Sequence, residues 1–225
     1  MALERTCTMK FGVFGTGRVG QALAGKLIHL GEPVMMGARQ SGNEQAVAWA
    51  SQAGELASQG SFADAARFGE ILINATAGTA SLAALQAAGA DNLRGKILID
   101  VSNPLEFGPG EIPRLSICNT DSLGEQIQRA FPDTYVVKTL NTMNNEVMVN
   151  PGLVSGSHNV LLSGNDPEAK QQVKALLERF GWPSTDILDL GDISSARGTE
   201  MYMPLWLRLW QTAGVSHFNI KVVGA

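Results

Sequence analysis

The chain is poor in the residues that build disulfide scaffolds and metal sites. Its 225 residues include only two cysteines, Cys7 and Cys118, and three histidines. The two cysteines form no Cys-x-x-Cys pattern, so we expect neither a disulfide framework nor a metal site. No apolar run approaches the roughly 20 residues that a membrane-spanning helix needs. The net charge is −4 and no basic cluster stands out, which argues against a nucleic-acid partner.

No secretory signal peptide is expected either. The segment from Met1 to Lys10 lacks the apolar core of a signal peptide, so a cytoplasmic location is expected. Hydrophobic residues make up 44% of the chain, enough to bury a sizeable core as one large or two small domains.

What the sequence does contain is a regular alternation of strand-like and helix-like segments. The strand-like segments cover residues 10–14, 33–37, 56–58, 70–74, 96–100 and 135–140. Helical spacing of apolar residues separates most of them. This alternation predicts an α/β fold of the Rossmann type, a doubly wound parallel sheet with helices on both faces, over residues 9–143.

The pattern loosens after Asn141, and residues 144–225 are expected to form a smaller C-terminal α/β lobe packed on the first domain. Strands are predicted near 160–162 and 185–190, and helices over 167–180 and 194–210, the latter open to a break at Pro204. The segment from Asn103 to Asn119, with three prolines and two glycines, is predicted to be a long loop.

A glycine run follows the first strand directly and precedes helical spacing. It reads Gly15-Thr16-Gly17-Arg18-Val19-Gly20. At a strand-to-helix turn, the first glycine permits the tight turn, the second lets the backbone approach a pyrophosphate, and the third lets helix and strand pack closely. The free N–H groups at the start of the helix favour phosphates. The run therefore predicts a dinucleotide site.

The end of the second strand indicates which dinucleotide binds. An NAD site would place Asp or Glu there to accept bonds from the ribose hydroxyls, but this chain has Arg39 and Ser41. An arginine fork pairs with a 2′-phosphate, and a serine hydroxyl donates to it, which favours NADP(H). Arg18 is open to two interpretations, an approach to the adenosine end or a solvent-facing side chain on the first helical turn.

Small polar residues follow three further strands at the carboxyl edge of the sheet, where ligands bind in open parallel sheets. Small side chains leave room for a ribose and a nicotinamide ring, while amides and hydroxyls can orient the ring. The candidates are Asn74, Ala75, Thr76 and Gly78 after the fourth strand, Asn103 after the fifth, and Asn141 and Thr142 after the sixth.

Proton donors are scarce around these strand ends. His158 and His217 have weak cases as acids, and His29 is expected at the surface. Reduction of a carbonyl needs a proton donor beside the hydride, whereas hydride transfer to a flavin-like ring depends chiefly on alignment. Two features stay open: Lys138 points either into the ligand cleft or to solvent, and residues 201–210 form either core and interface or a wall of the acceptor pocket.

Several motifs together resemble one family. In order they are Gly15 to Gly20, Gly37-Ala38-Arg39, Val137-Lys138-Thr139-Leu140-Asn141-Thr142 and Ala196-Arg197-Gly198-Thr199-Glu200. The chain resembles NADP-dependent oxidoreductases of the coenzyme F420 (8-hydroxy-5-deazaflavin) type, which include the reductase domain of STEAP-type metalloreductases. The resemblance implies a homodimer with NADPH presented to a flat acceptor, with Thr16 at the pyrophosphate and Arg39 and Ser41 at the 2′-phosphate. It further implies Asn74, Thr76, Asn103, Asn141 and Thr142 around the nicotinamide and acceptor.

The sequence thus predicts an enzyme that passes hydride between NADP(H) and a flavin or deazaflavin, with F420, FMN and FAD as candidate acceptors. Two alternatives remain at this stage. One is an NADPH-dependent reductase of a small imine or carbonyl compound, and the other is a non-catalytic NADP(H) sensor. The sensor would use the fold to bind a further partner. For the enzyme the expected partner is a small-molecule redox cofactor or substrate, and neither a membrane nor a nucleic acid is expected.

Overall fold

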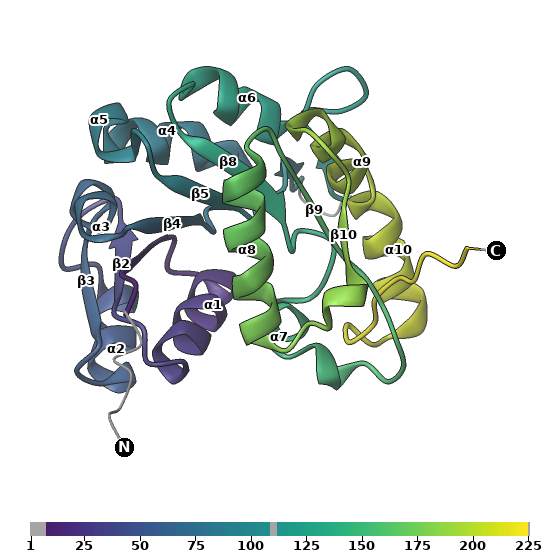
Figure 1. The fold of residues 1–225 in the computed structure, drawn as a ribbon, viewed down its shortest axis with the longest axis horizontal. Helices are drawn as coiled ribbons and strands as arrows, with labels where there is room; N and C mark the ends of the chain where they lie inside the picture. The colour runs from purple at the N-terminus through teal and green to yellow at the C-terminus, as the bar shows by residue number, and fades with distance from the viewer. Residues whose placement is uncertain (1–7, 109–111, 225) are drawn as a thin grey trace.

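A computed structural model describes residues 8–108 and 112–224 of the chain. Its centre is one eight-stranded sheet in the order β10-β9-β8-β5-β4-β1-β2-β3 (Figure 1). The strands are β1 (Phe11–Phe14), β2 (Val34–Ala38), β3 (Ala57–Ser61), β4 (Ile71–Asn74), β5 (Ile97–Asp100), β8 (Tyr135–Thr139), β9 (Val160–Gly164) and β10 (Ile187–Asp189). The short strands β6 (Leu105–Glu106) and β7 (Arg114–Leu115) pair separately.

Helices follow most of the strands. They are α1 (Arg18–His29), α2 (Glu44–Ala53), α3 (Phe62–Phe68), α4 (Gly78–Ala88), α5 (Ala90–Leu93), α6 (Leu123–Ala130), α7 (Asn145–Val149), α8 (Pro167–Phe180), α9 (Ala196–Met201) and α10 (Met203–Ala213). Short 3-10 turns cover Pro151–Leu153, Ser184–Asp186 and Ile193–Ser195. Within the described part of the chain, no helix is long and apolar enough to cross a membrane.

Two hydrophobic cores lie on opposite faces of the sheet because successive strand side chains alternate in direction. Val13, Ile73 and Ile99 pack with α1, α2, α7 and α8. Their neighbours Phe14, Leu72 and Leu98 pack with α3 to α6 instead. In Figure 1, α1 and α8 cross the face of the sheet nearest the viewer. Helices on both faces confirm the doubly wound prediction.

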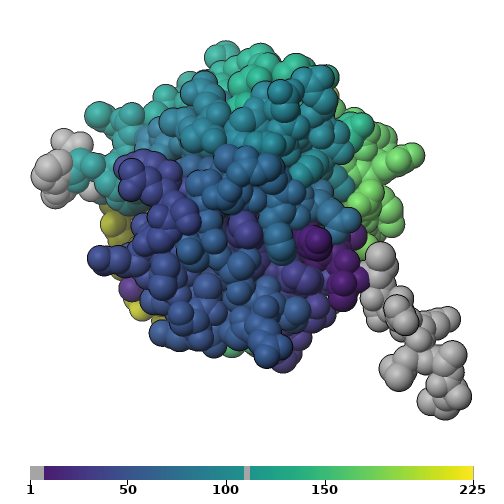
Figure 2. All heavy atoms as spheres, turned by 90° about the vertical axis from the view of Figure 1, so that its left-hand side faces the viewer, coloured from purple at the N-terminus to yellow at the C-terminus, as the bar shows by residue number. Residues whose placement is uncertain are grey.

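The strand directions confirm the parallel sheet for β1 to β5 and β8. The remaining two strands extend the same sheet with reversed direction, since β9 pairs antiparallel with β8 and β10 pairs parallel with β9. Residues after 143 therefore contribute both sheet strands and the outlying helices α9 and α10 (Figure 1). A domain boundary at residue 143 stays a prediction. Figure 2 shows the opposite, β3 end of the molecule, where the surface is built almost wholly from the first half of the chain.

Two local expectations have different outcomes. The break at Pro204 is confirmed, because α9 ends at Met201 and a separate helix, α10, starts at Met203 with the proline in its first turn. The segment after Asn103 is not only a loop, since Leu105 pairs with Leu115 in an antiparallel hairpin. Residues 109–111 of that segment lie outside the described residues. So does Cys7, whereas Cys118 is an exposed free thiol.

Candidate functional site

The glycine turn joins β1 to α1 as the sequence predicts. Gly15 has φ +114°, and a side chain there would place its Cβ 2.5 Å from the Ala75 carbonyl oxygen. A Cβ on Gly20 would lie 2.2 Å from the Gly15 carbonyl oxygen. A Cβ on Gly17, by contrast, would meet no atom within 4 Å. The first and third glycines are therefore required by packing, and the second leaves free space in front of the helix.

That free space faces the start of α1. In the described structure no side chain caps this helix, and its first turn contains no acidic residue. The unpaired N–H groups and the helix dipole are thus available to an anion. Thr16 lies beside them, donating its hydroxyl hydrogen to Gln45 Oε1 at 2.9 Å. Arg18 is exposed at the first turn, and Val19 is half-buried.

A cavity of about 560 Å³ opens beside the glycine turn. We call it the adenosine half of the groove. Arg39 lies at its rim, exposed and without an ion pair among the described residues. Ser41 is exposed two residues further along the same loop. The wall includes Phe62, which sequence reasoning missed, and an alanine face of α4 formed by Ala80, Ala83, Ala84 and Ala87.

The contact that places Phe62 is tertiary. Its ring packs edge-on against Phe14 with the centroids 5.9 Å apart. Ser61 caps α3 through a reciprocal capping box with Asp64, and this cap sets where the helix and its first residue begin. The only sequence signal for Phe62 is its place directly after the cap at the end of β3. A half-buried aromatic ring beside Arg39 suits the flat face of an adenine.

A second cavity of about 250 Å³ continues the groove and shares Ala75, Thr76 and Ala77 with the first. We call it the nicotinamide half. Its polar lining comes from Thr76 after β4, from Ser102 and Asn103 after β5, and from Asn141 after β8. Its other lining residues are Val19, Gly78, Val101, Leu105, Phe107, Met143, Met148 and Met203. The predicted convergence of three strand ends on one groove is therefore found.

The two asparagines in this half hold each other in place. The Asn103 side-chain amide donates to the Asn141 carbonyl oxygen at 2.8 Å, and the Asn141 amide donates to Asn103 Oδ1 at 2.9 Å. Leu140, just before, has φ +63°, a left-handed conformation that is unfavourable for a branched residue. Because strained backbone persists only where the surroundings enforce it, the end of β8 is a rigidly held part of the groove.

Other predicted site residues lie behind the groove rather than on it. Asn74 is fully buried, and its amide donates to Ser81 Oγ and Asp100 Oδ1. Thr76, which does line the groove, donates its hydroxyl hydrogen to Asn74 Oδ1 at 2.7 Å. Thr142 is 1% exposed and lines neither cavity, and its hydroxyl has no partner among the described residues.

Gly78 lines the nicotinamide half for a packing reason. A Cβ at this position would lie 2.0 Å from the Asn103 carbonyl oxygen, too close for any side chain. The glycine therefore lets the start of α4 contact the loop after β5. A bulky residue there would displace that loop rather than simply fill the space for a ring.

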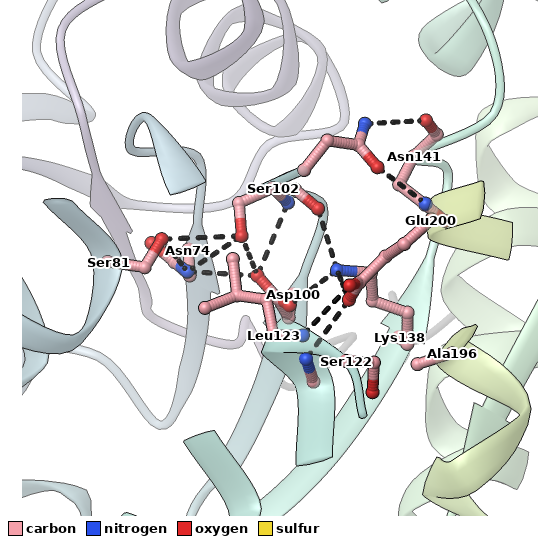
Figure 3. Close-up of polar contacts among 12 residues, drawn as sticks. Asn74, Ser81, Asp100, Ser102, Ser122, Leu123, Lys138, Asn141, Ala196 and Glu200 are labelled. Atoms are coloured by element: carbon pink, nitrogen blue, oxygen red, sulfur yellow. Dashed lines mark hydrogen bonds and ion pairs between the residues drawn. The ribbon is translucent and has the colours of Figure 1, made fainter. Parts of the chain in front are cut away.

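Lys138 fits neither of the two interpretations left open by the sequence. Its side chain is fully buried, between Asp100 and Glu200, with its ammonium 2.8 Å from a carboxylate oxygen of each (Figure 3). Burial alone would lower the pKa of this lysine, but the attraction of the two carboxylates outweighs it and holds the pKa above its ordinary value. The lysine is therefore a charged internal contact and faces neither solvent nor the groove.

No histidine lines either cavity in the described structure. His158 is buried, where Nε2 contacts the Pro151 carbonyl oxygen at 3.0 Å and Nδ1 contacts the Asn219 amide at 2.9 Å. His217 pairs with Glu146 at the surface, and His29 is exposed as predicted.

The aromatic segment over residues 201–210 combines both of its interpretations. Met203 lines the nicotinamide half, which makes the segment a wall of the groove. Trp206 is buried and stacks on Phe218 with the centroids 5.4 Å apart. Trp210 and Leu205 are exposed on the outer side of α10.

A separate cavity of about 310 Å³ lies at the opposite, amino edge of the sheet. It is lined by the starts of β4, β5 and β8 and by the carboxylates of Glu70, Asp166 and Glu168. Lys96 also lines it, so acidic side chains outnumber the basic one, and the cavity lacks the glycine turn found at the other edge.

Comparison with known proteins agrees with the geometry. Residues 10–104 match the family model described as NADP oxidoreductase, coenzyme F420-dependent. A crystal structure from Arthrobacter sp. FB24, provisionally designated an F420-dependent NADP reductase, is 48% identical and superimposes with a TM-score of 0.90, covering 96% of this chain and 100% of that one.

More distant relatives share part of the chain or only the fold. The rat metalloreductase STEAP3 is 30% identical over 205 residues, which are 88% of this chain but 38% of that protein. An imine reductase from Aspergillus terreus, solved with NADPH4 and dibenz[c,e]azepine, is 19% identical with a TM-score of 0.65, over 93% of this chain and 64% of that one. At that identity the likeness shows the fold alone. Taken with the glycine turn and the groove, the near full-length match shows that this chain belongs to the coenzyme F420-dependent family of NADP oxidoreductases and is an NADP-dependent oxidoreductase.

Proposed function

We propose that this enzyme transfers hydride between NADP(H) and the ring of a flavin or deazaflavin. The observation that carries the proposal is the lining of the nicotinamide half. Among the described residues, that lining contains methionines, one leucine, one phenylalanine, two asparagines and smaller side chains, but no titratable side chain. Such a surface can align a flat ring and exclude water, and it offers no acid to a reacting carbonyl.

The adenosine half supplies binding. The pyrophosphate is held by the N–H groups at the start of α1, against the open face of Gly17, with Thr16 beside it. Arg39 and Ser41 bind the 2′-phosphate, and Phe62 packs on the adenine. Arg18, the first residue of α1, adds positive charge at this turn.

The nicotinamide half supplies alignment. The ribose lies along the short side chains of Val19 and of residues Ala75 to Ala77, which leave room for it. Asn103 and Asn141 hold one edge of the nicotinamide, and Met143, Met148 and Met203 form an apolar surface against the rings. Bound NADPH supplies the hydride, and the chain's own groups fix the distance and face across which it moves. Sulfur–aromatic contacts from the methionines favour a flat acceptor.

The choice between a ring acceptor and an imine or carbonyl depends on whether the groove supplies a proton donor. A general acid has to lie within hydrogen-bond reach of the reacting atom, and removing one typically costs about 10²–10⁴-fold in rate. A flavin or deazaflavin ring becomes an anion when it accepts hydride, and solvent protonates this anion later. Its reduction therefore needs no general acid in the groove. The imine reductases share this fold at under 25% identity and do not change this argument.

The proposal is tested by anaerobic stopped-flow mixing of the NADPH complex with FMN, FAD and F420 in turn. We expect the absorbance of at least one oxidised acceptor to disappear at a saturable rate that requires the enzyme. A cyclic imine and a simple ketone serve as matched alternatives. Enzyme-dependent oxidation of NADPH by either of these, with none by the three rings, would make the protein an imine or carbonyl reductase instead. Binding of NADPH with no oxidation by any acceptor would indicate a sensor.

The state of assembly completes the proposal. The family resemblance implies a homodimer, and the exposed apolar residues Leu205, Leu209 and Trp210 on α10 provide a surface that a second copy could cover. Sedimentation of the purified protein, with and without NADPH, gives the mass of the assembly directly.

A further inference from the structure

Two segments that are far apart in the sequence meet inside the molecule, next to the nicotinamide half. Lys138 belongs to β8, and Glu200 to α9. With Asp100 at the end of β5 they form one buried charged group, in which none of the three side chains is more than 1% exposed (Figure 3). We refer to Lys138, Asp100 and Glu200 as the buried triad.

Every N–H of the lysine ammonium is used within this group. One donates to Asp100 Oδ2 at 2.8 Å, one to the Ser102 carbonyl oxygen at 2.6 Å, and one faces Glu200 Oε1 at 2.8 Å. Ser102 lines the nicotinamide half, so the ammonium holds a piece of the groove by its backbone. The Asp100 carboxylate holds the same residue from the other side, accepting from the Ser102 hydroxyl at 2.6 Å and from its backbone N–H at 3.2 Å.

Glu200 extends the connection to two helices. Its carboxylate accepts the backbone N–H groups of Leu123 and Gly124 at 2.8 and 3.0 Å, which caps the start of α6. Its own helix, α9, leads into α10, where Met203 also lines the nicotinamide half. The buried triad is therefore linked to that half through Ser102 and, along the chain, through Met203.

Stability alone is a poor explanation for this arrangement. Burying three charged groups is costly, and replacing a buried ion pair or triad with well-packed apolar residues is often neutral or stabilising. A network with all of its donors and acceptors satisfied does, however, hold its members in a single geometry. Alignment of a ring is the property that such a geometry would serve in this groove.

We propose that Lys138 is a positioning residue, which acts with Asp100 and Glu200 to fix the Ser102–Asn103 backbone against which the nicotinamide ring lies. The inference rests on the proposed function only in placing the nicotinamide in this half of the groove, and it does not depend on which acceptor is used. Among the described residues, the triad bonds directly to Ser102 at the ring end, and it reaches Thr76, which both halves share, only through Asn74. Its main effect is therefore expected at the ring end of the cofactor.

The test compares two double variants that make the same chemical changes. Lys138→Met with Glu200→Gln removes the ammonium and one carboxylate, which preserves the net charge of the triad. Glu125→Gln with Arg197→Met removes the ion pair between Glu125 and Arg197, which joins the same two helices, α6 and α9, outside the triad. The control variant therefore reports what loosening the helix contact does by itself.

Two ligands allow the effects on the two halves of the groove to be measured separately. NADPH occupies both halves, while adenosine 2′,5′-bisphosphate lacks the nicotinamide. For the triad variant we expect NADPH to bind about tenfold more weakly, its bound-state fluorescence lifetime to move toward the value in water, and adenosine 2′,5′-bisphosphate to bind as in wild type. A displacement of the ring by about 1 Å is enough to cost about 10²-fold in hydride transfer. The control should match wild type in all of these measurements.

Equal losses for both ligands, or equal losses in the triad variant and the control, would overturn the positioning role. Wild-type protein that binds NADPH no more tightly than adenosine 2′,5′-bisphosphate would instead contradict the placement of the nicotinamide, and with it the proposed function.

A measurement on wild-type protein does not depend on the folding of any variant. In a sample labelled with ¹⁵N-lysine, the buried ammonium of Lys138 exchanges slowly enough with water to be followed by NMR. We expect its resonance to shift when NADPH binds and to stay in place when adenosine 2′,5′-bisphosphate binds. An ammonium resonance that NADPH leaves unchanged would show that the triad does not sense the ring.

Discussion

The two halves of the groove are built in opposite ways. The adenosine half presents an uncapped helix start, an open position at Gly17 and an exposed arginine, with few internal hydrogen bonds among the groups that would face a ligand. The nicotinamide half is cross-braced by the reciprocal amide bonds of Asn103 and Asn141 and by the buried triad behind them.

This difference separates binding from alignment. Groups that are free and charged before the ligand arrives can contribute affinity and discriminate between nucleotides. Groups that already satisfy one another contribute little new attraction, but they hold a ring in one orientation without reorganising. Changes in the adenosine half should therefore alter chiefly dissociation constants, whereas changes in the nicotinamide half should lower the rate of hydride transfer more than they weaken binding.

The largest effect is expected at Gly17. A Cβ at this position would meet no protein atom within 4 Å, and a valine side chain would occupy the space proposed for the pyrophosphate. We expect Gly17→Val to fold normally and to bind NADPH at least about 100-fold more weakly, a loss of about 2.8 kcal/mol. Gly25→Val on the same helix, also at an open position, is the matched control. Near-wild-type affinity in Gly17→Val, measured by fluorescence titration, would remove the pyrophosphate from this turn.

Arg39 should determine which dinucleotide is preferred. A charge-assisted pair with the 2′-phosphate is worth about 1.5–3 kcal/mol, so wild type should favour NADPH over NADH by about 10- to 100-fold. Arg39→Ala should remove most of that preference and leave NADH binding almost unchanged. Arg18→Ala, at the exposed first residue of α1, decides between the two interpretations of that residue, since weaker NADPH binding favours an approach to the adenosine end. If wild type binds both dinucleotides equally, the assignment of NADP(H) to Arg39 is wrong.

Histidine variants examine the claim that the nicotinamide half lacks an acid. His158→Ala and His217→Ala should each retain turnover within about tenfold, less than the loss expected for a general acid. His158→Ala should still destabilise the fold by about 1–3 kcal/mol, because the Pro151 carbonyl oxygen and the Asn219 amide each lose one hydrogen bond. Thermal unfolding and steady-state turnover, measured on the same samples, separate these effects. A thousandfold loss of turnover in a histidine variant with normal unfolding would favour a carbonyl or imine reductase.

The smallest effect concerns the start of α6, behind the nicotinamide half. A hydrogen bond from Arg129 lowers the pKa of Asp121 from 3.8 to about 2. Because the folded-state pKa is the lower one, the ion pair stabilises the protein above pH 3.8, and this contribution is lost as the pH falls toward 2. Asp121→Asn should therefore be less stable than wild type at pH 6, with the gap closing at pH 2 to 3 in urea titrations. Asp91→Asn, which breaks a more exposed pair with Arg94, should differ little from wild type at either pH.

The sequence predicted those parts of the molecule that depend on short stretches of chain. Strand positions, the glycine turn and the helix over 167–180 follow from local periodicity and from backbone chemistry. The reversed direction of β9 could not be predicted in this way, because a connection of similar composition can lead into a parallel or an antiparallel strand. The hairpin of β6 and β7 is too short to show a periodic pattern.

Within the site, the strand ends were predictable but the side-chain directions were not. Asn141 and Asn103 line the groove, while Asn74 and Thr142, which sit at equivalent strand ends, turn into the interior. A one-residue difference in register decides between these outcomes. Lys138 was ambiguous for the same reason, since its partners Asp100 and Glu200 come from other elements and only the folded sheet brings them together.

The central claim is that one face of a nicotinamide ring, held against the braced half of the groove, passes hydride to a flat acceptor. Single-turnover oxidation of NADPH carrying deuterium at either the 4R or the 4S position tests it most directly, with whichever of FMN, FAD or F420 reacts. The account predicts a primary isotope effect with one of the two labelled cofactors and none with the other, because only one face is presented. Equal isotope effects from both, or none from either while the acceptor is reduced, would contradict it.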